Sequence, residues 1–81
     1  MMINLKERDF VFMKILGEKE LPLGVLGSKM GLHKFSIQRI FNKLEQSGLI
    51  DSRKDGRERL VKLNKNGKYF NEFYKKQKNK S

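Results

Sequence analysis

The sequence contains no cysteine, and this absence excludes several kinds of chemistry at once. A chain without thiols forms no disulfide, thiolate zinc site or iron–sulfur cluster, and it has no thiol nucleophile. Its composition also fits a reducing compartment. Histidine occurs once, at His33, and one histidine does not make a metal site. We therefore expect neither a metal nor another cofactor.

Long apolar runs are also missing. The longest uninterrupted run covers residues 10–13, whereas a transmembrane helix needs about 20 apolar residues. Lys6, Glu7 and Arg8 interrupt the N-terminal region where a secretory signal would carry its apolar segment. We expect a cytoplasmic protein without a membrane partner.

Acidic residues are scarce relative to basic ones. Nine Asp and Glu stand against 19 Lys and Arg, which gives a formal net charge of +10 on 81 residues. Such a charge is typical of a protein that binds a polyanion. It leaves open a ribosome-associated or membrane-surface protein and favours a nucleic-acid partner. The length suits one small domain, whose 37% hydrophobic residues can form one layer of packed helices with a hairpin.

Apolar spacing predicts two helices in the first part of the chain. The first covers residues 5–16, with Asn4 as its N-cap and Glu7 completing a capping box. Pro22 fits the first position of the second helix, where its missing N–H is harmless. Gly27 lies on the inner side of that helix, where we expect another helix to approach closely.

A tight turn at Gly31 and Leu32 leads to a third helix. Gly31 suits the left-handed conformation that ends a helix, and we expect Leu32 to be buried in the corner. The third helix runs from about His33 to Ser47. Its apolar stripe at helical spacing is Ile37, Ile40, Phe41 and Leu44.

A β-hairpin follows the third helix. Its first strand begins at Leu49 and continues to about Arg53, and its second strand covers residues 58–63. The pair Asp55-Gly56 between them is typical of a tight hairpin turn. The predicted fold is therefore mainly α with a small β-hairpin (α+β), in the order helix-helix-helix-hairpin-helix. A hairpin directly after a helix-turn-helix unit makes it a winged helix-turn-helix.

The last helix is capped by Asn64, and its early Asn66-Gly67 pair is unfavourable but tolerated. We assign residues 1–74 to one domain and residues 75–81 to a basic polar tail that should fray.

Four short motifs follow one another within residues 3–74. Residues 21–33 look like a short second helix, a glycine-containing turn and a helix start. Residues 44–50 match the pattern Leu-Glu-x-x-Gly-Leu-Ile, residues 55–59 look like a basic wing turn, and residues 63–67 are similar to Leu-Thr-x-x-Gly. Together they resemble the winged-helix domain of MarR-like transcriptional regulators. The resemblance implies a double-stranded DNA-binding regulator.

The sequence departs from this family outside the motifs. Full-length members carry extra helices at both ends that form the dimer, whereas about four residues precede the first predicted helix here. The ligand pocket between the dimerisation and DNA-binding parts would be mostly missing, so we expect no small-molecule effector.

Two groups of residues are the candidate DNA contacts. The third helix supplies the base-reading group, because amide side chains pair with adenine edges and arginine pairs with guanine. Its members are His33, Lys34, Phe35, Ser36, Gln38, Arg39, Asn42 and Lys43. For Phe35 the sequence leaves open contact with a thymine methyl or packing against the second helix. The hairpin supplies Lys54, Arg57 and Arg59 for the backbone or the minor groove.

Four aromatic residues in the last helix exceed what one small core needs. They are Tyr69, Phe70, Phe73 and Tyr74. Because they span more than one side of the helix, we expect a homodimer interface there, joined by Phe10 or Met13 of the first helix.

Other functions remain open at this point. The same fold could serve a replication-initiation, plasmid or viral accessory protein, or a protein–protein interaction module. RNA is a weaker option, because no aromatic stacking motif lies on a sheet. An enzyme is not expected, because the sequence shows no activated nucleophile and no phosphate-binding glycine loop.

Overall fold

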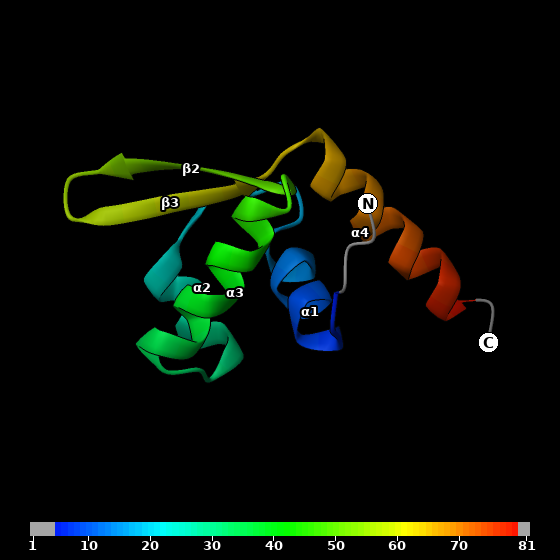
Figure 1. Cartoon of the computed structure of the whole chain (residues 1–81), viewed down its shortest axis with the longest axis horizontal. Coiled ribbons are helices and arrows are strands. Elements are labelled where there is room, and N and C mark those ends of the chain that lie inside the picture. Colours follow the sequence, from blue (N-terminus) through cyan, green and yellow to red (C-terminus); the bar gives the residue numbers. More distant parts are fainter. Residues whose placement is uncertain (1–4, 80–81) are drawn as a thin grey trace.

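The structure, a computed structural model, describes the backbone of residues 5–79 and the side chains of residues 5–74. The elements in this part of the chain form a small helical domain from which a long hairpin projects (Figure 1). In chain order they are α1 (Glu7–Leu16), β1 (Leu21–Pro22), α2 (Leu23–Met30), α3 (Lys34–Gln46), β2 (Ile50–Asp55), β3 (Glu58–Leu63) and α4 (Lys65–Asn79). The predicted winged helix-turn-helix order is confirmed. None of the described helices is long and apolar enough to cross a membrane.

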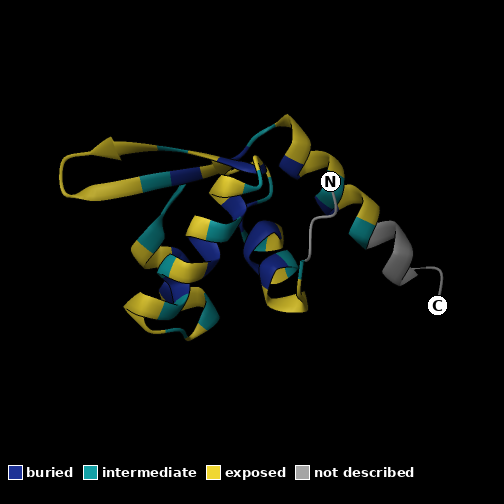
Figure 2. Ribbon diagram, viewed as in Figure 1, coloured by how far each residue is buried: buried dark blue, intermediate teal, exposed yellow. Residues whose placement is uncertain are grey.

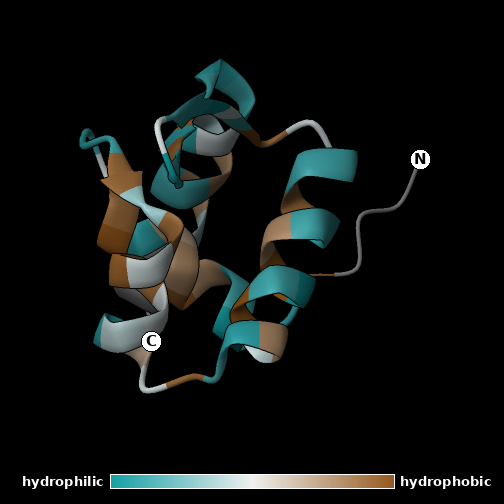
Figure 3. Ribbon diagram, turned by 90° about the vertical axis from the view of Figure 1, so that its left-hand side faces the viewer, coloured by the Kyte–Doolittle hydropathy of each residue, from teal (hydrophilic) through white to brown (hydrophobic). Residues whose placement is uncertain are grey.

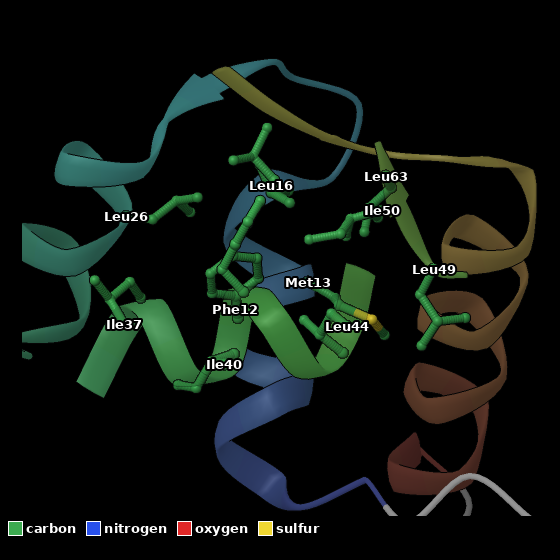
Figure 4. Packing of buried hydrophobic residues seen from close by; sticks show 12 residues of the cluster. Phe12, Met13, Leu16, Leu26, Ile37, Ile40, Leu44, Leu49, Ile50 and Leu63 are labelled. Atoms are coloured by element: carbon green, nitrogen blue, oxygen red, sulfur yellow. The ribbon is translucent and has the colours of Figure 1, made fainter. Parts of the chain in front are cut away.

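One apolar core joins the first three helices to the base of the hairpin (Figure 2). The predicted stripe of α3 is confirmed, since all four of its residues are buried. Side chains from these elements meet at one centre (Figure 4). The buried hydrophobic residues are Phe12, Met13, Leu16, Leu26, Ile37, Ile40, Phe41, Leu44, Leu49, Ile50, Val61 and Leu63.

The hairpin is confirmed, and it is longer than predicted. Its strands pair antiparallel from Ile50 opposite Leu63 to Asp55 opposite Glu58, so β2 extends two residues beyond Arg53. Gly56 and Arg57 form the turn, and Gly56 has a positive φ of 63°. A glycine with positive φ at the first turn position matches the right-handed twist of a hairpin.

A third strand, β1, is an element that sequence reasoning missed. Leu21 pairs with Val61 and Pro22 pairs with Leu60, giving the antiparallel order β1-β3-β2. Pro22 is therefore the N-cap of α2, with an extended backbone, and the prediction that it is the first helical residue was wrong by one position. Proline has no N–H to donate, so it is tolerated only where no ladder hydrogen bond needs that donor, as on the edge strand β1.

The predicted cap of α1 was wrong in part. The helix begins at Glu7, and Lys6 is its N-cap. The backbone N–H of Lys6 donates to Asp9 Oδ2 at 2.8 Å, so Asp9 has the capping-box role that we predicted for Glu7. The predicted cap residue Asn4 lies outside the described residues.

The turn between α2 and α3 confirms the roles of two glycines. Gly31 adopts the left-handed conformation, with φ 65° and ψ 33°. Gly27 is buried, and a Cβ there would lie 3.4 Å from Cγ2 of Ile37 on α3. The small residue thus lets α2 and α3 pack closely. Leu32 is half-buried against the core, less enclosed than we expected.

The start of α4 depends on two residues. Asn64 caps the helix as predicted, accepting a hydrogen bond from the N–H of Gly67 at 2.9 Å. Its Nδ2 also donates to the carbonyl of Gly48 at 2.8 Å, which ties α4 to the end of α3. Gly67 is a position that only glycine fits, because a Cβ there would overlap the carbonyl oxygen of Leu49. Our interpretation of Gly67 as merely tolerated was wrong. The helix runs through Asn79, so its backbone includes most of the predicted tail.

Replacing Gly67 with alanine should destabilise the domain by about 2–3 kcal/mol, because backbone must move to relieve the overlap. Gly24 is the matched control. It also lies early in a helix, and a Cβ there would meet nothing within 4 Å. Gly24→Ala should raise stability by about 0.5 kcal/mol through lower unfolded-state entropy. Urea titrations of both variants measure the difference, and equal effects would contradict the packing at Gly67.

Candidate nucleic-acid interface

The side of α3 away from the core is polar and mostly exposed. We call it the outward face; it consists of Lys34, Phe35, Gln38, Arg39 and Asn42. These residues recur at helical spacing because the buried stripe occupies the other side of the same helix. Gln38 Nε2 donates to Asn42 Oδ1 at 3.0 Å, so the two amides are aligned along the helix. His33 is the exposed N-cap, and Ser36 is half-buried at the margin of the face.

The wing, formed by β2, β3 and their turn, is also basic at its tip. Lys54, Arg57 and Arg59 are all exposed. Seen from the end of the hairpin, the ribbon of the tip is hydrophilic (Figure 3). Alternation along β3 places Arg59 on the same side as buried Val61 and Leu63, facing the helices. Its guanidinium lies 5.9 Å from the ring centroid of Phe41.

A short hydrogen-bond chain fixes the wing relative to α3. Arg59 Nη1 donates to Ser52 Oγ at 3.1 Å, and Ser52 Oγ donates to Glu45 Oε2 at 3.0 Å. Arg59 on β3, Ser52 on β2 and Glu45 on α3 are thus linked. Glu45 is the first acidic residue of α3. Its carboxylate accepts the hydrogen bond from Ser52 at the base of the wing.

An open groove of about 710 Å³ separates the wing from α2 and α3. Its charged lining comes from three elements and the wing turn: Lys29 of α2, Lys34 of α3, Arg57 and Arg59, with Glu58 as the acidic member. Gln38 also lines it. The groove therefore places basic side chains of α2, α3 and the wing around one space, whose remaining lining is mostly apolar. The sequence did not single out Lys29, because only the tertiary packing of α2 brings it beside the wing.

Lys43 is engaged inside the domain. Its Nζ lies 2.6 Å from Asp9 Oδ2, and the Asp9 side chain is only 5% exposed. The same carboxylate oxygen accepts the N–H of Lys6, so one buried group ties α1 to α3. Sequence reasoning grouped Lys43 with the DNA contacts because it lies on a polar helix; the partner across 34 residues could not be predicted from local spacing.

A second ion pair links the residue before β1 to β2, the opposite edge strand of the sheet. Arg53 makes two hydrogen bonds to Glu20, at 3.0 and 3.2 Å. Hydrogen bonding from Arg53 lowers the pKa of Glu20 below its ordinary value. A lowered carboxyl pKa means that this pair stabilises the fold above the acidic range and loses its effect as the pH falls through that pKa. The positive charge of Arg53 is thus balanced by the carboxylate of Glu20.

The four aromatic residues of α4 divide into two pairs. Phe70 is half-buried against the core, and Tyr74 stacks on Phe10 of α1, with ring centroids 4.0 Å apart and planes at 10°. Tyr69 and Phe73 point outward and are 63% and 52% exposed. We call these two the outer aromatic pair. Met13 is fully buried, so the expectation that it joins a dimer interface was wrong.

Comparison with solved structures identifies the fold. The regulator PcaV of Streptomyces coelicolor, solved with its natural ligand, superposes with a TM-score of 0.80 at 24% identity, covering 84% of this chain and 51% of PcaV. Reduced HlyU of Vibrio cholerae gives 0.78 at 25% identity, covering 84% of this chain and 73% of HlyU. FabT of Streptococcus pneumoniae, solved with DNA, gives 0.84 at 14% identity, covering 94% of this chain and 56% of FabT.

These similarities show the class of fold: a winged helix-turn-helix domain. This likeness agrees with the resemblance of the four sequence motifs to the winged-helix domain of MarR-like regulators. The chain spans about half the length of PcaV and FabT, so it corresponds to part of those proteins. No protein-family model and no curated protein matches the sequence.

Lys43→Met should lower the unfolding free energy by about 1–2 kcal/mol, because it leaves the buried Asp9 carboxylate without its cation. The exposed Lys34→Met is the control and should stay within about 0.5 kcal/mol of wild type. Adding Asp9→Asn to Lys43→Met should cost less than the sum of the single changes. Thermal unfolding of these three variants and of Asp9→Asn alone tests this prediction. Additive losses in the double variant would refute a direct interaction.

Proposed function

We propose that this protein binds double-stranded DNA as a transcriptional regulator, with α3 in the major groove and the wing on the backbone or in the minor groove. One observation carries the proposal. The outward face of α3 has no acidic residue, and it shares with the wing a groove that four basic side chains line. The net charge of +10 supplies the long-range attraction to a polyanion.

The dimensions and the side-chain chemistry support α3 as the reading helix. A helix of about 10–12 Å diameter fits a major groove about 12 Å wide. Gln38 and Asn42 can pair with adenine, and Arg39 can pair with the two acceptors of guanine. The hydrogen bond between the two amides holds them in one orientation before DNA arrives. We leave Lys43 out of the proposed contacts, because Asp9 already engages its ammonium group.

The groove between α3 and the wing is suited to a phosphodiester strand. A reading helix in the major groove and a wing in the next minor groove must straddle the backbone between them. Lys34 and Arg59 approach that space from opposite walls, and Arg57 lies at the tip of the hairpin. Basic residues at these places would neutralise phosphates rather than read bases.

We further propose that the protein acts as a homodimer through α4. The exposed Tyr69 and Phe73 lie on the side of α4 away from Phe10 and the core. A second copy of the same helix would cover this outer aromatic pair, and its two-fold axis would present two α3 helices to half-sites about 10 base pairs apart. Because the pair is small, dimerisation should be weak without DNA.

Two variants separate base reading from phosphate contact. Arg39→Ala should weaken binding to a site selected from random duplexes by about 1–3 kcal/mol and barely change binding to unrelated duplexes. Arg57→Ala should weaken all duplexes alike, or those with A·T flanks most if it enters a narrow minor groove. Fluorescence anisotropy with both variants and both kinds of duplex makes the measurement.

The salt dependence of wild-type binding tests the function itself. If about six phosphates are neutralised, the slope of log affinity against log salt should be about −5. A slope near zero, or no bound duplex at any salt concentration, would refute DNA binding and favour a protein–protein interaction module.

The dimer is tested by Tyr69→Ser with Phe73→Ser. This double variant should stay monomeric in sedimentation at concentrations where wild type self-associates, and it should lose affinity for inverted repeats but not for single half-sites. Val11→Ser, an exposed apolar position on α1 (40% exposed), is the control. Wild type that remains monomeric both at high concentration and on an inverted repeat would contradict the proposal.

A further inference from the structure

We propose that Phe35 determines specificity by contacting the 5-methyl group of a pyrimidine in the major groove; this rests on the proposed DNA-binding function. The side chain is 82% exposed, more than any other large hydrophobic residue among the described ones. The sequence left open whether Phe35 packs against α2, and this exposure excludes such packing. A phenyl ring left in water by the fold gains free energy from any apolar group that covers it.

The position of Phe35 makes it part of the interface. Gln38, Arg39 and Asn42 lie three, four and seven residues later, so they share one stripe of α3 with it. Its direct neighbours on the chain are Lys34 and Ser36. An isolated ring among polar side chains does not form a surface for a folded apolar partner. Its occupant should therefore be a small apolar group within a polar surface.

The major groove presents one apolar group of this kind, the methyl at C5 of thymine. A cytosine methylated at C5 places the same group at the same position of the ring. The chemistry recognised is therefore a 5-methylpyrimidine, from thymine or from methylated cytosine. The amide and arginine side chains beside it present hydrogen-bonding groups, so Phe35 is the apolar side chain of the outward face.

Helix geometry sets the expected register. Phe35 precedes Arg39 by four residues, which is about 6 Å along the helix axis. Base pairs rise about 3.4 Å each. The methylated pyrimidine should therefore lie about two base pairs from the purine that Arg39 contacts. This spacing is a second, independent test of the assignment.

The experiment removes single methyl groups. Duplexes are selected from one random pool with ordinary bases and from another in which 5-methylcytosine replaces cytosine. In each selected site, every thymine is replaced by uracil, or every 5-methylcytosine by cytosine, one position at a time. Wild type should lose about fourfold in affinity at one position, as expected for uncovering one methyl-sized group. Arg39→Ala should locate the purine two base pairs away.

The variants assign the loss to Phe35. Phe35→Ala should bind the intact and the demethylated duplex equally, whereas Phe35→Leu should keep part of the discrimination. Val11→Ala, an exposed apolar position on α1, should keep all of it. Because Phe35 is exposed, its variants should melt at the wild-type temperature.

The outcomes distinguish the two proposals. A Phe35-dependent loss with uracil supports thymine as the source, and one confined to the methylated pool supports 5-methylcytosine. Salt-dependent binding without any Phe35-dependent methyl effect overturns this inference and leaves the proposed function standing. Failure to select any duplex from either pool overturns both.

Discussion

The burial of one apolar stripe on α3 is the interaction on which the rest of the structure depends. Ile37, Ile40, Phe41 and Leu44 fill the centre of a small domain whose core also draws on α1, α2 and the hairpin. A domain of this size buries only about 60% of its unfolded surface, so few residues can be spared from the core. The same burial fixes which side of α3 faces solvent. One helix therefore supplies both the centre of the core and the polar face that we propose reads DNA.

Polar contacts then determine how that helix is oriented relative to its neighbours. Asp9 binds Lys43 in the C-terminal half of α3, and Glu45, two residues further on, accepts a hydrogen bond from Ser52 of the wing. The first contact ties α3 to α1, and the second ties it to β2. Such contacts between elements have directions that apolar packing lacks. The second contact links α3 to the hairpin at the base of the wing, beside the outward face.

Local patterns in the sequence predicted most of the elements and the basic residues at the tip of the wing. The stripe of α3, the glycine turn before it, the hairpin and the Asn64 cap each depend on residues within a few positions of one another. What was missed depends on distant partners. Strand β1 exists because two residues reach β3 some forty positions away, and Gly67 is required because Leu49 approaches it. The ion pair of Lys43 could not be predicted either, because its partner Asp9 lies on another helix.

The aromatic residues of α4 also show that tertiary contacts cannot be predicted from local sequence. Their number in α4 indicated a surplus, but only the structure divides it: Phe70 and Tyr74 pack inward, and Tyr69 and Phe73 remain outside. The stack of Tyr74 on Phe10 also packs α4 against α1. The outer aromatic pair therefore lies on a helix that the rest of the domain supports. Phe35 is held in the same way by α3. In both places an exposed ring stands on a helix whose other side is packed, so covering the ring requires no rearrangement of the domain and orders few additional groups.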